Sequence, residues 1–174
     1  MTEASTAGLT ERLKSFDGFL ERLAKDHGLA TLDLVKQLPA QNLCIVPGSR
    51  MLDILKDISG WGPILFITEG AHIITGQSAE LPQVFLHEGY YHFFGQGGFG
   101  GHIEEGACKS IAFIDRPFQK RRSLSIHFYG PTGEPMFKIF VSRELSGEMS
   151  EKQVESYFAL RDQMDKAQSI ALEN

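Results

Sequence analysis

The chain has 174 residues, of which 42% are hydrophobic and 22% charged, and its formal net charge is −5. These values are ordinary for one soluble globular domain, and they exclude a disordered or collagen-like chain and a disulfide-rich scaffold. The acidic balance argues against binding to nucleic acid, whose phosphates repel acidic proteins. No apolar run is long enough to span a membrane, and the first 30 residues lack a secretory apolar region. We therefore expect a cytoplasmic protein that does not insert into a membrane.

Helical patterns dominate the first sixty residues. Apolar side chains recur every three or four positions from Leu9 to Leu23, and Gly28 follows in the position of a C-cap. Thr31 is expected to be the N-cap of a second helix that ends before Pro39. Three helices are therefore expected, over residues 9–27, 31–38 and 49–59.

Strand patterns follow from Pro63 onward. In the clearest one, Leu124, Ile126 and Phe128 alternate with Ser125 and a histidine. The turns between successive runs are short, which favours antiparallel pairing. The expected strands cover residues 63–68, 71–77, 90–94, 101–105, 109–115, 123–129 and 137–141.

A last helical pattern runs from about residue 150 to residue 169. This order of elements predicts an α+β fold, in which a curved antiparallel sheet carries N-terminal helices and a C-terminal helix. We expect a single domain with a helical part (residues 1–60), a sheet (63–143) and the last helix (150–170).

Four of the six histidines fall within a stretch of 31 residues of the predicted strand region, at positions 72, 87, 92 and 102. Histidine is the commonest transition-metal ligand in proteins, so the group suggests work on a metal or a cofactor. Neither their spacing nor the two cysteines match a zinc motif. The alternative is that these are surface or hydrogen-bonded histidines on half-buried strands. Hydrolytic catalysis finds little support, since there is no nucleophile elbow.

Residues 95–100 read GQGGFG and match the GxGxxG pattern. A dinucleotide-binding loop must open a helix, whereas a strand is predicted to follow here, so we reject that interpretation. The glycines instead suit a hairpin, or close approach of the backbone to a flat ligand. Phe99 and its neighbours Phe93 and Phe94 would line an apolar pocket or belong to the ordinary core.

Four cations lie within seven residues, namely Arg116, Lys120, Arg121 and Arg122. In an acidic protein this group is a candidate anion site. The alternative is a solvated turn between two strands.

Blocks of sequence spread from Gly28 to Glu144 carry a resemblance to a known family. They read LP, VPG, WG, ELP, GHI, IAFIDRPF and MFKIFVSR, beginning at residues 38, 46, 61, 80, 101, 111 and 136. In order and spacing they resemble the intracellular heme utilisation proteins of the HutX/ChuX family. The resemblance implies a cytoplasmic heme-binding protein that buffers heme or passes it to a partner. It also implies a fold similar to half of the HemS/ChuS-type proteins and a homodimer.

The resemblance assigns roles to single residues. The histidine of the family's GHI block corresponds to His102, the best candidate for an iron ligand, and Arg116 matches the family's arginine before Pro-Phe. A second family histidine corresponds to Glu69, a departure that puts bis-histidine ligation in doubt. His72, three residues further on, is a candidate substitute.

Other candidates complete the expected heme site. Tyr90 and His92 share one face of a strand and are fallback iron ligands, since histidine and tyrosinate both hold ferric iron. Phe99 would line the slot for the ring. Arg116 and Arg122 would meet the propionates, although Arg116 is equally expected as an ion-pair partner within the sheet.

The leading hypothesis is a heme carrier that hands heme to a heme-accepting or heme-degrading protein. The first alternative is an enzyme that degrades heme, as in the related HemS-type proteins. The second, prompted by Glu69, is a regulatory or interaction domain that has lost heme binding.

Overall fold

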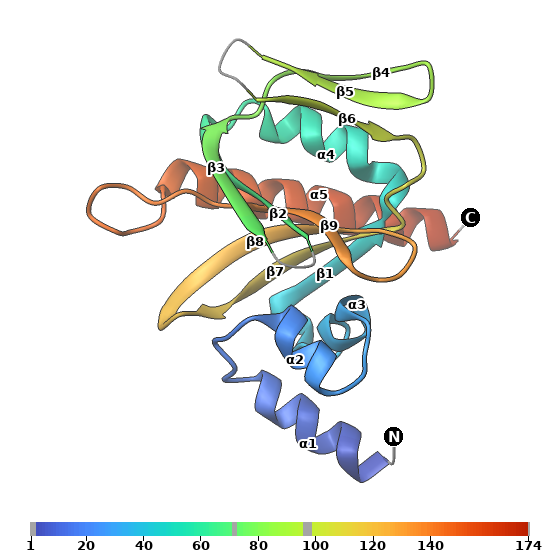
Figure 1. Ribbon diagram of the computed structural model, residues 1–174, viewed down its shortest axis with the longest axis vertical. Coiled ribbons are helices and arrows are strands. Elements are labelled where there is room, and N and C mark those ends of the chain that lie inside the picture. Colours follow the sequence, from blue (N-terminus) through green and yellow to red (C-terminus); the bar gives the residue numbers. More distant parts are fainter. Residues whose placement is uncertain (1–2, 71–72, 96–98, 174) are drawn as a thin grey trace.

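The protein is described by a computed structural model (Figure 1), which places residues 3–70, 73–95 and 99–173, with side chains over residues 8–70, 73–95 and 99–167. The helices within these ranges are α1 (Glu3–Leu13), α2 (Leu20–Asp26), α3 (Thr31–Val35), α4 (Met51–Ile58) and α5 (Glu151–Glu173), with short 3₁₀ turns at Ala40–Asn42 and Gly48–Arg50. The strands are β1 (Leu43–Pro47), β2 (Pro63–Glu69), β3 (Ile74–Glu80), β4 (Val84–His87), β5 (Tyr90–Phe94), β6 (Gly100–Glu104), β7 (Ser110–Phe118), β8 (Arg121–Tyr129) and β9 (Pro135–Phe140).

The strands form two antiparallel sheets rather than the one that the sequence suggests. The large sheet has the order β1-β7-β8-β9-β2-β3, and the small sheet has the order β4-β5-β6. Figure 1 shows the small sheet at the top, above α4, with α5 running beside the large sheet and α1–α3 gathered below it. The fold class of the prediction is confirmed: helices flank antiparallel sheets, and a long helix ends the chain.

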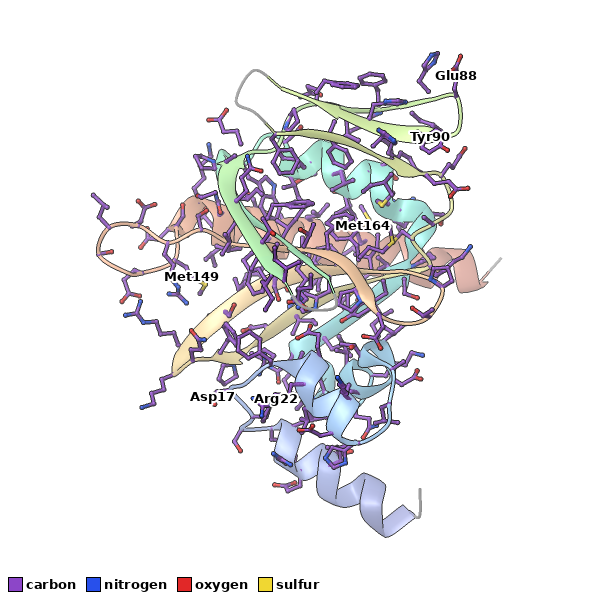
Figure 2. The ribbon with its side chains drawn as sticks, in the orientation of Figure 1. Asp17, Arg22, Glu88, Tyr90, Met149 and Met164 are labelled. Carbon is purple, nitrogen blue, oxygen red and sulfur yellow. The ribbon has the colours of Figure 1, made fainter. Side chains whose placement is uncertain are left out.

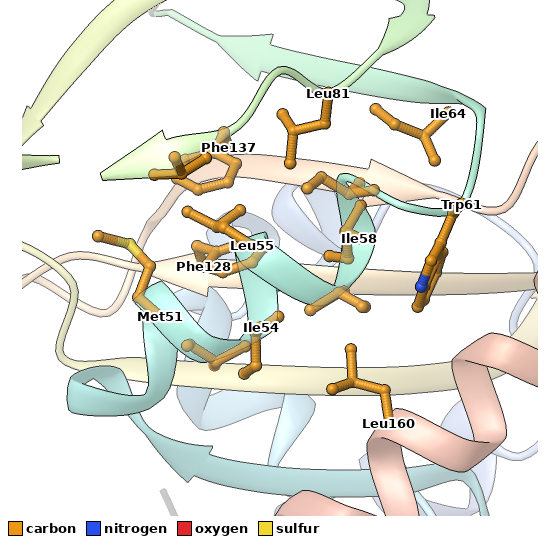
Figure 3. Packing of buried hydrophobic residues seen from close by; sticks show 14 of the residues in the cluster. Met51, Ile54, Leu55, Ile58, Trp61, Ile64, Leu81, Phe128, Phe137 and Leu160 are labelled. Carbon is orange, nitrogen blue, oxygen red and sulfur yellow. The ribbon is translucent and has the colours of Figure 1, made fainter. Parts of the chain in front are cut away.

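The main core lies between the large sheet, α4, α5 and the small sheet. Strand alternation turns Leu124, Ile126 and Phe128 of β8 toward this core, as the sequence predicts, and all three are fully buried. Figure 3 shows the apolar side chains of α4 packed against Phe128 and Phe137. One face of the large sheet is therefore committed to the core.

The opposite face of the large sheet is only partly covered. Leucines of α1, α2 and α3 pack against Ala112, Ile114 and Tyr129, which lie on the β7–β8 side of this face. Over β9, β2 and β3, no described helix adds buried apolar side chains to this face, although Glu21 of α2 pairs with Lys138 of β9. This difference leaves room for a groove beside α2.

The predicted helix over residues 9–27 is wrong as a single element, because α1 ends at Leu13 and α2 begins at Leu20. In the intervening segment the carbonyls of Phe16 and Gly18 accept hydrogen bonds from Arg116 Nη2, at 2.9 and 2.7 Å. The carbonyl of Asp17 accepts one from the amide of Gln119, at 2.9 Å. These carbonyls accept hydrogen bonds from the β7–β8 hairpin instead of the hydrogen bonds that would continue a helix.

Smaller differences concern boundaries. Thr31 is the first residue of α3 rather than its N-cap, and its hydroxyl donates to the carboxylate of Glu134. The strand expected over residues 71–77 begins at Ile74, while residues 71 and 72 lie outside the described residues. Strands β1 and β4 were not predicted, because each is short and has no long alternating pattern.

Candidate functional site

Histidines and aromatic residues gather on the outer face of the small sheet. In the register of the three strands Phe85 of β4, His92 of β5 and His102 of β6 are direct neighbours. Residues two positions along the same strands, Tyr90 and Phe94 among them, share this face. We call the set the histidine face; it consists of Phe85, His87, Tyr90, His92, Phe94 and His102.

The rings of the histidine face touch one another in a nearly continuous layer. His92 stacks on Phe85 at 5.4 Å and on Phe94 at 5.8 Å between ring centroids, and its centroid lies 6.1 Å from that of His102. Tyr90 meets His102 edge to face at 5.4 Å. Phe94 is 64% exposed, Phe85 48% and Tyr90 40%. An exposed apolar layer of this kind is typical of a surface that binds a flat ligand or a partner.

Three of the predicted iron ligands therefore come together, since His102, His92 and Tyr90 all belong to the histidine face. A Cβ placed on Gly101, next to His102, would meet no atom within 4 Å, so the space there is open. Figure 2 places Tyr90 and Glu88 at the free end of the small sheet. His72 lies outside the described residues.

Phe99 lies behind this face rather than on it. It is 9% exposed, and its ring packs edge to face on Phe66 at 4.8 Å and against Phe93 at 6.2 Å. These rings line a cavity of about 230 Å³ between the two sheets, and His102 borders its rim. Phe99 therefore connects to His102 through an apolar pocket.

The cations of the predicted basic patch point in different directions. Arg122 is bound by both carboxylate oxygens of Asp115, with Nε at 2.9 Å and Nη2 at 2.6 Å, and this hydrogen bonding raises its pKa. Its guanidinium also lies 5.7 Å from the ring of Phe158 in α5. Arg116, by contrast, is on the other face of the large sheet and only 9% exposed. The structure does not bring Arg116 or Arg122 to the histidine face.

Arg116 lines a groove beside α2, where the structure also places Glu69. Thr68 and Glu69 are consecutive in β2, so Thr68 faces the pocket near His102 and Glu69 faces this groove. Lys138 of β9 is 4% exposed; its ammonium lies 2.6 Å from Glu69 Oε1 and also pairs with Glu21 of α2. Glu69, which the family resemblance aligns with a histidine, is thus one of two carboxylates that pair with the buried Lys138.

His127 of β8 lies in the same groove. Its ring nitrogens are 3.0 Å from Ser125 Oγ and 3.2 Å from Tyr129 Oη. Complete burial, together with the charges of Lys138 and Arg116, lowers the pKa of His127 well below its usual value. The imidazole is therefore neutral and engaged in hydrogen bonds.

Sequence reasoning missed Phe85 and Lys138. Phe85 joins the histidine face through strand pairing, which local patterns do not reveal, whereas His87 and Phe94 were already named as a candidate histidine and a candidate pocket residue. Lys138 lies between Phe137 and Ile139 in β9, and this alternation places it on the other face of the strand. No local pattern in the sequence indicated that this other face is also buried. Among the described residues, no cluster of three metal-ligating side chains is arranged to hold a metal ion. No helix in the described ranges is long and apolar enough to cross a membrane.

Comparison with known proteins agrees with this architecture. The crystal structure of ChuX superimposes with a TM-score of 0.86 and 31% identity, over 91% of this chain and 98% of that one. ChuS, a heme-degrading enzyme of Escherichia coli O157:H7, superimposes with a TM-score of 0.75 over 91% of this chain but only 48% of its own. At 13% identity this likeness concerns the fold alone. The architecture is thus that of ChuX and of half of a ChuS-type protein.

Sequence comparison then gives the family. The Haem utilisation ChuX/HutX family matches residues 44–160. The intracellular heme transport protein HutX of Vibrio cholerae serotype O1 (strain ATCC 39315 / El Tor Inaba N16961) is 30% identical over 142 residues, which are 81% of this chain and 74% of that protein. This chain belongs to the ChuX/HutX family, as the sequence blocks indicated.

Proposed function

We propose that this protein binds heme within the cell and carries it to a heme-accepting or heme-degrading partner. The observation that carries the proposal is the histidine face, where His102 stands in a layer of exposed aromatic rings. The related proteins support it by name, because HutX is an intracellular heme transport protein and ChuX a heme-binding protein.

The chemistry of the histidine face suits heme. Phe85, Phe94 and Tyr90 would offer aromatic surface to the flat apolar porphyrin, and a histidine of this face would supply an imidazole nitrogen to its iron. His102 is the proposed ligand, with His92 and Tyr90 beside it as substitutes. Because the face is exposed rather than enclosed, bound heme stays accessible to an acceptor. This accessibility favours a carrier.

Two further parts of the proposal concern partners. A second copy of the chain is proposed to form a homodimer, as the family resemblance implies, and sedimentation equilibrium of the protein with and without hemin tests it. A single species at the mass of one chain in both conditions would contradict the dimer.

The propionates are proposed to extend toward cations outside the histidine face, since its described members supply none.

A hemin titration of the purified protein tests heme binding. We expect a saturable Soret shift at one heme per chain, and for His102→Ala a changed coordination spectrum and weaker binding. His27→Ala, at the end of α2, is a matched control that removes a histidine far from the small sheet in the fold. The absence of a saturable shift in the unmodified protein would refute heme binding, and an unchanged His102→Ala spectrum would refute His102 as the ligand.

Ascorbate and oxygen distinguish a carrier from the heme-degrading alternative. We expect the bound heme spectrum to persist under these conditions. Loss of the Soret band with formation of a biliverdin-like product would instead identify an enzyme.

A further inference from the structure

A second binding region lies between the small sheet and the large sheet, behind the histidine face. It is the cavity of about 230 Å³ that Phe66, Phe93 and Phe99 line, and we call it the intersheet pocket. Protein interiors are closely packed and rarely leave a void larger than one water molecule. An engineered apolar cavity of about 150 Å³ holds one benzene molecule, whereas drug-sized ligands occupy roughly 300–1,000 Å³. The volume therefore suits a molecule of one or two fused aromatic rings and is too small for a porphyrin.

The floor of the intersheet pocket is aromatic, and its mouth is open to solvent. Phe99 and Phe137 are buried, and Phe66 packs edge to face on Phe99 and stacks on Phe137, with ring centroids 4.8 and 5.0 Å apart. Thr68 and Gly101, which also line the pocket, are exposed. Aromatic rings favour an aromatic occupant, which they meet in stacked or edge-to-face contacts. A ligand that enters past Thr68 and Gly101 can therefore reach buried rings.

The space arises from a missing side chain on the inner face of the small sheet. In the register of β5 and β6, Gly101 lies directly opposite the buried Phe93, and Ile103 follows on the same face. A Cβ placed on Gly101 would meet no atom within 4 Å. The glycine therefore leaves a gap beside Phe93 that the neighbouring side chains do not fill.

Open main-chain groups border the same pocket. Four consecutive residues of β6, from Gly100 to Ile103, line it. A strand face would contribute alternate residues only, so the edge of β6 borders the pocket. Within the described part of the chain β6 pairs with β5 alone, so the N–H and C=O groups along its other edge are available to a ligand. The hydroxyl of Thr68, on β2, adds a side-chain donor and acceptor.

The charge of the lining limits the ligand to a neutral molecule. None of the described lining residues is Asp, Glu, Lys or Arg, and the ring of His102 belongs to the histidine face rather than to the interior. An ion that entered would lose its hydration without gaining a charged partner, which is costly.

We propose that the intersheet pocket binds a small neutral aromatic molecule with one hydrogen-bonding group, such as an indole or a phenol. The ring lies among Phe66, Phe93 and Phe99, and the polar group bonds the open edge of β6 or the hydroxyl of Thr68. The proposal does not depend on heme binding, because the side chains of the histidine face lie on the other side of the small sheet.

Titration calorimetry of the heme-free protein with indole and with phenol tests the proposal. We expect saturable binding of at least one of them at one molecule per chain, with NMR amide shifts confined to β6, Phe93 and Phe99. Methylation of the indole nitrogen or the phenol oxygen removes the donor and should weaken binding about two- to tenfold, as one neutral hydrogen bond does. Failure of both probes to bind, or amide shifts that lie elsewhere, would overturn the proposal. Unchanged affinity after methylation would refute the donated hydrogen bond.

A pair of tryptophan variants locates the site. Thr68→Trp fills the mouth from an exposed strand position and should weaken binding at least about tenfold. Ser146→Trp is the control, since it adds the same ring in the exposed loop between β9 and α5, away from the small sheet (Figure 1), and should bind as the unmodified protein does. Circular dichroism identifies a variant that fails to fold. Unchanged affinity in folded Thr68→Trp, or an equal loss in Ser146→Trp, would overturn the proposal, whatever the outcome of the hemin titration.

Discussion

Replacing Lys138 by methionine should be among the most destabilising single changes in the sheet. Lys138 is 4% exposed and its ammonium pairs with two carboxylates, while the side chains of Glu21 and Glu69 remain 21% and 18% exposed. Removing one partner of a buried ion pair costs about 3–5 kcal/mol because the remaining charge stays buried without compensation. Since both carboxylates keep contact with water, we expect the lower end, about 3 kcal/mol.

Urea unfolding followed by far-ultraviolet circular dichroism measures this difference, and a melt should show a Tm lower by about 6–12 °C. Lys36→Met is the matched control, because Lys36 pairs with Asp33 at 3.0 Å on the surface, where both side chains are more than half exposed. It should cost no more than about 0.5 kcal/mol.

A triple variant separates the loss of the ion pair from the loss of packing. With Glu21→Gln and Glu69→Gln added to Lys138→Met, none of the three charges of this ion pair remains, so most of the lost stability should return. The reasoning fails if Lys138→Met is as stable as Lys36→Met, or if the triple variant is as unstable as Lys138→Met alone.

Three further predictions concern buried groups. The pKa of His127 is lower in the folded protein than the value of about 6.5 in the unfolded chain, so the unfolded chain takes up an extra proton in acid. The free energy of unfolding should therefore fall by up to about 1.4 kcal/mol per pH unit as the pH drops below about 6.5. His127→Gln should reduce this slope in urea titrations from pH 7.5 to 5. Burial raises the pKa of both Cys44 and Cys108 to about 11, so few of these thiols are ionised at pH 8. Their alkylation by iodoacetamide at this pH, followed by mass spectrometry, should be at least about tenfold slower than that of free cysteine. An equal rate would contradict this. A Cβ at Gly48 would stand 2.0 Å from the carbonyl oxygen of Cys108, so Gly48→Ala should cost about 2 kcal/mol by urea unfolding, and a neutral effect would show that this contact relaxes.

The parts of the fold that the sequence predicted well are those with a local cause. The alternation of Leu124, Ile126 and Phe128 is a property of one strand, and the four buried positions of α4 are a property of one helix. The unbroken helix over residues 9–27 failed because its interruption depends on Arg116, about a hundred residues further along the chain. The apolar spacing survives in both helices, since Leu13 and Leu20 are each buried.

The candidate site shows the same division between local and long-range causes. Tyr90 and His92 were predicted to share a face because they are two residues apart in one strand, and His102 joins them only through the register of β5 and β6. The group of cations around residue 120 was visible in the sequence, but the sequence did not show that its members lie on different faces of the large sheet. Arg116 is buried beside α2, where it lines the groove, and Arg122 is held by Asp115 on the core side of the sheet.

The resemblance aligns Glu69 with the family's second histidine. In this fold, that difference does not affect the proposed ligation of heme by His102. Thr68 borders the pocket that His102 also lines, whereas Glu69, the next residue, lies on the other face and is held by Lys138. A histidine at position 69 of the same chain would therefore face the groove beside α2, on the other side of the large sheet from the pocket that His102 borders. Glu69 accordingly contributes its charge to the groove beside α2 and leaves His102 and the rest of the histidine face unchanged.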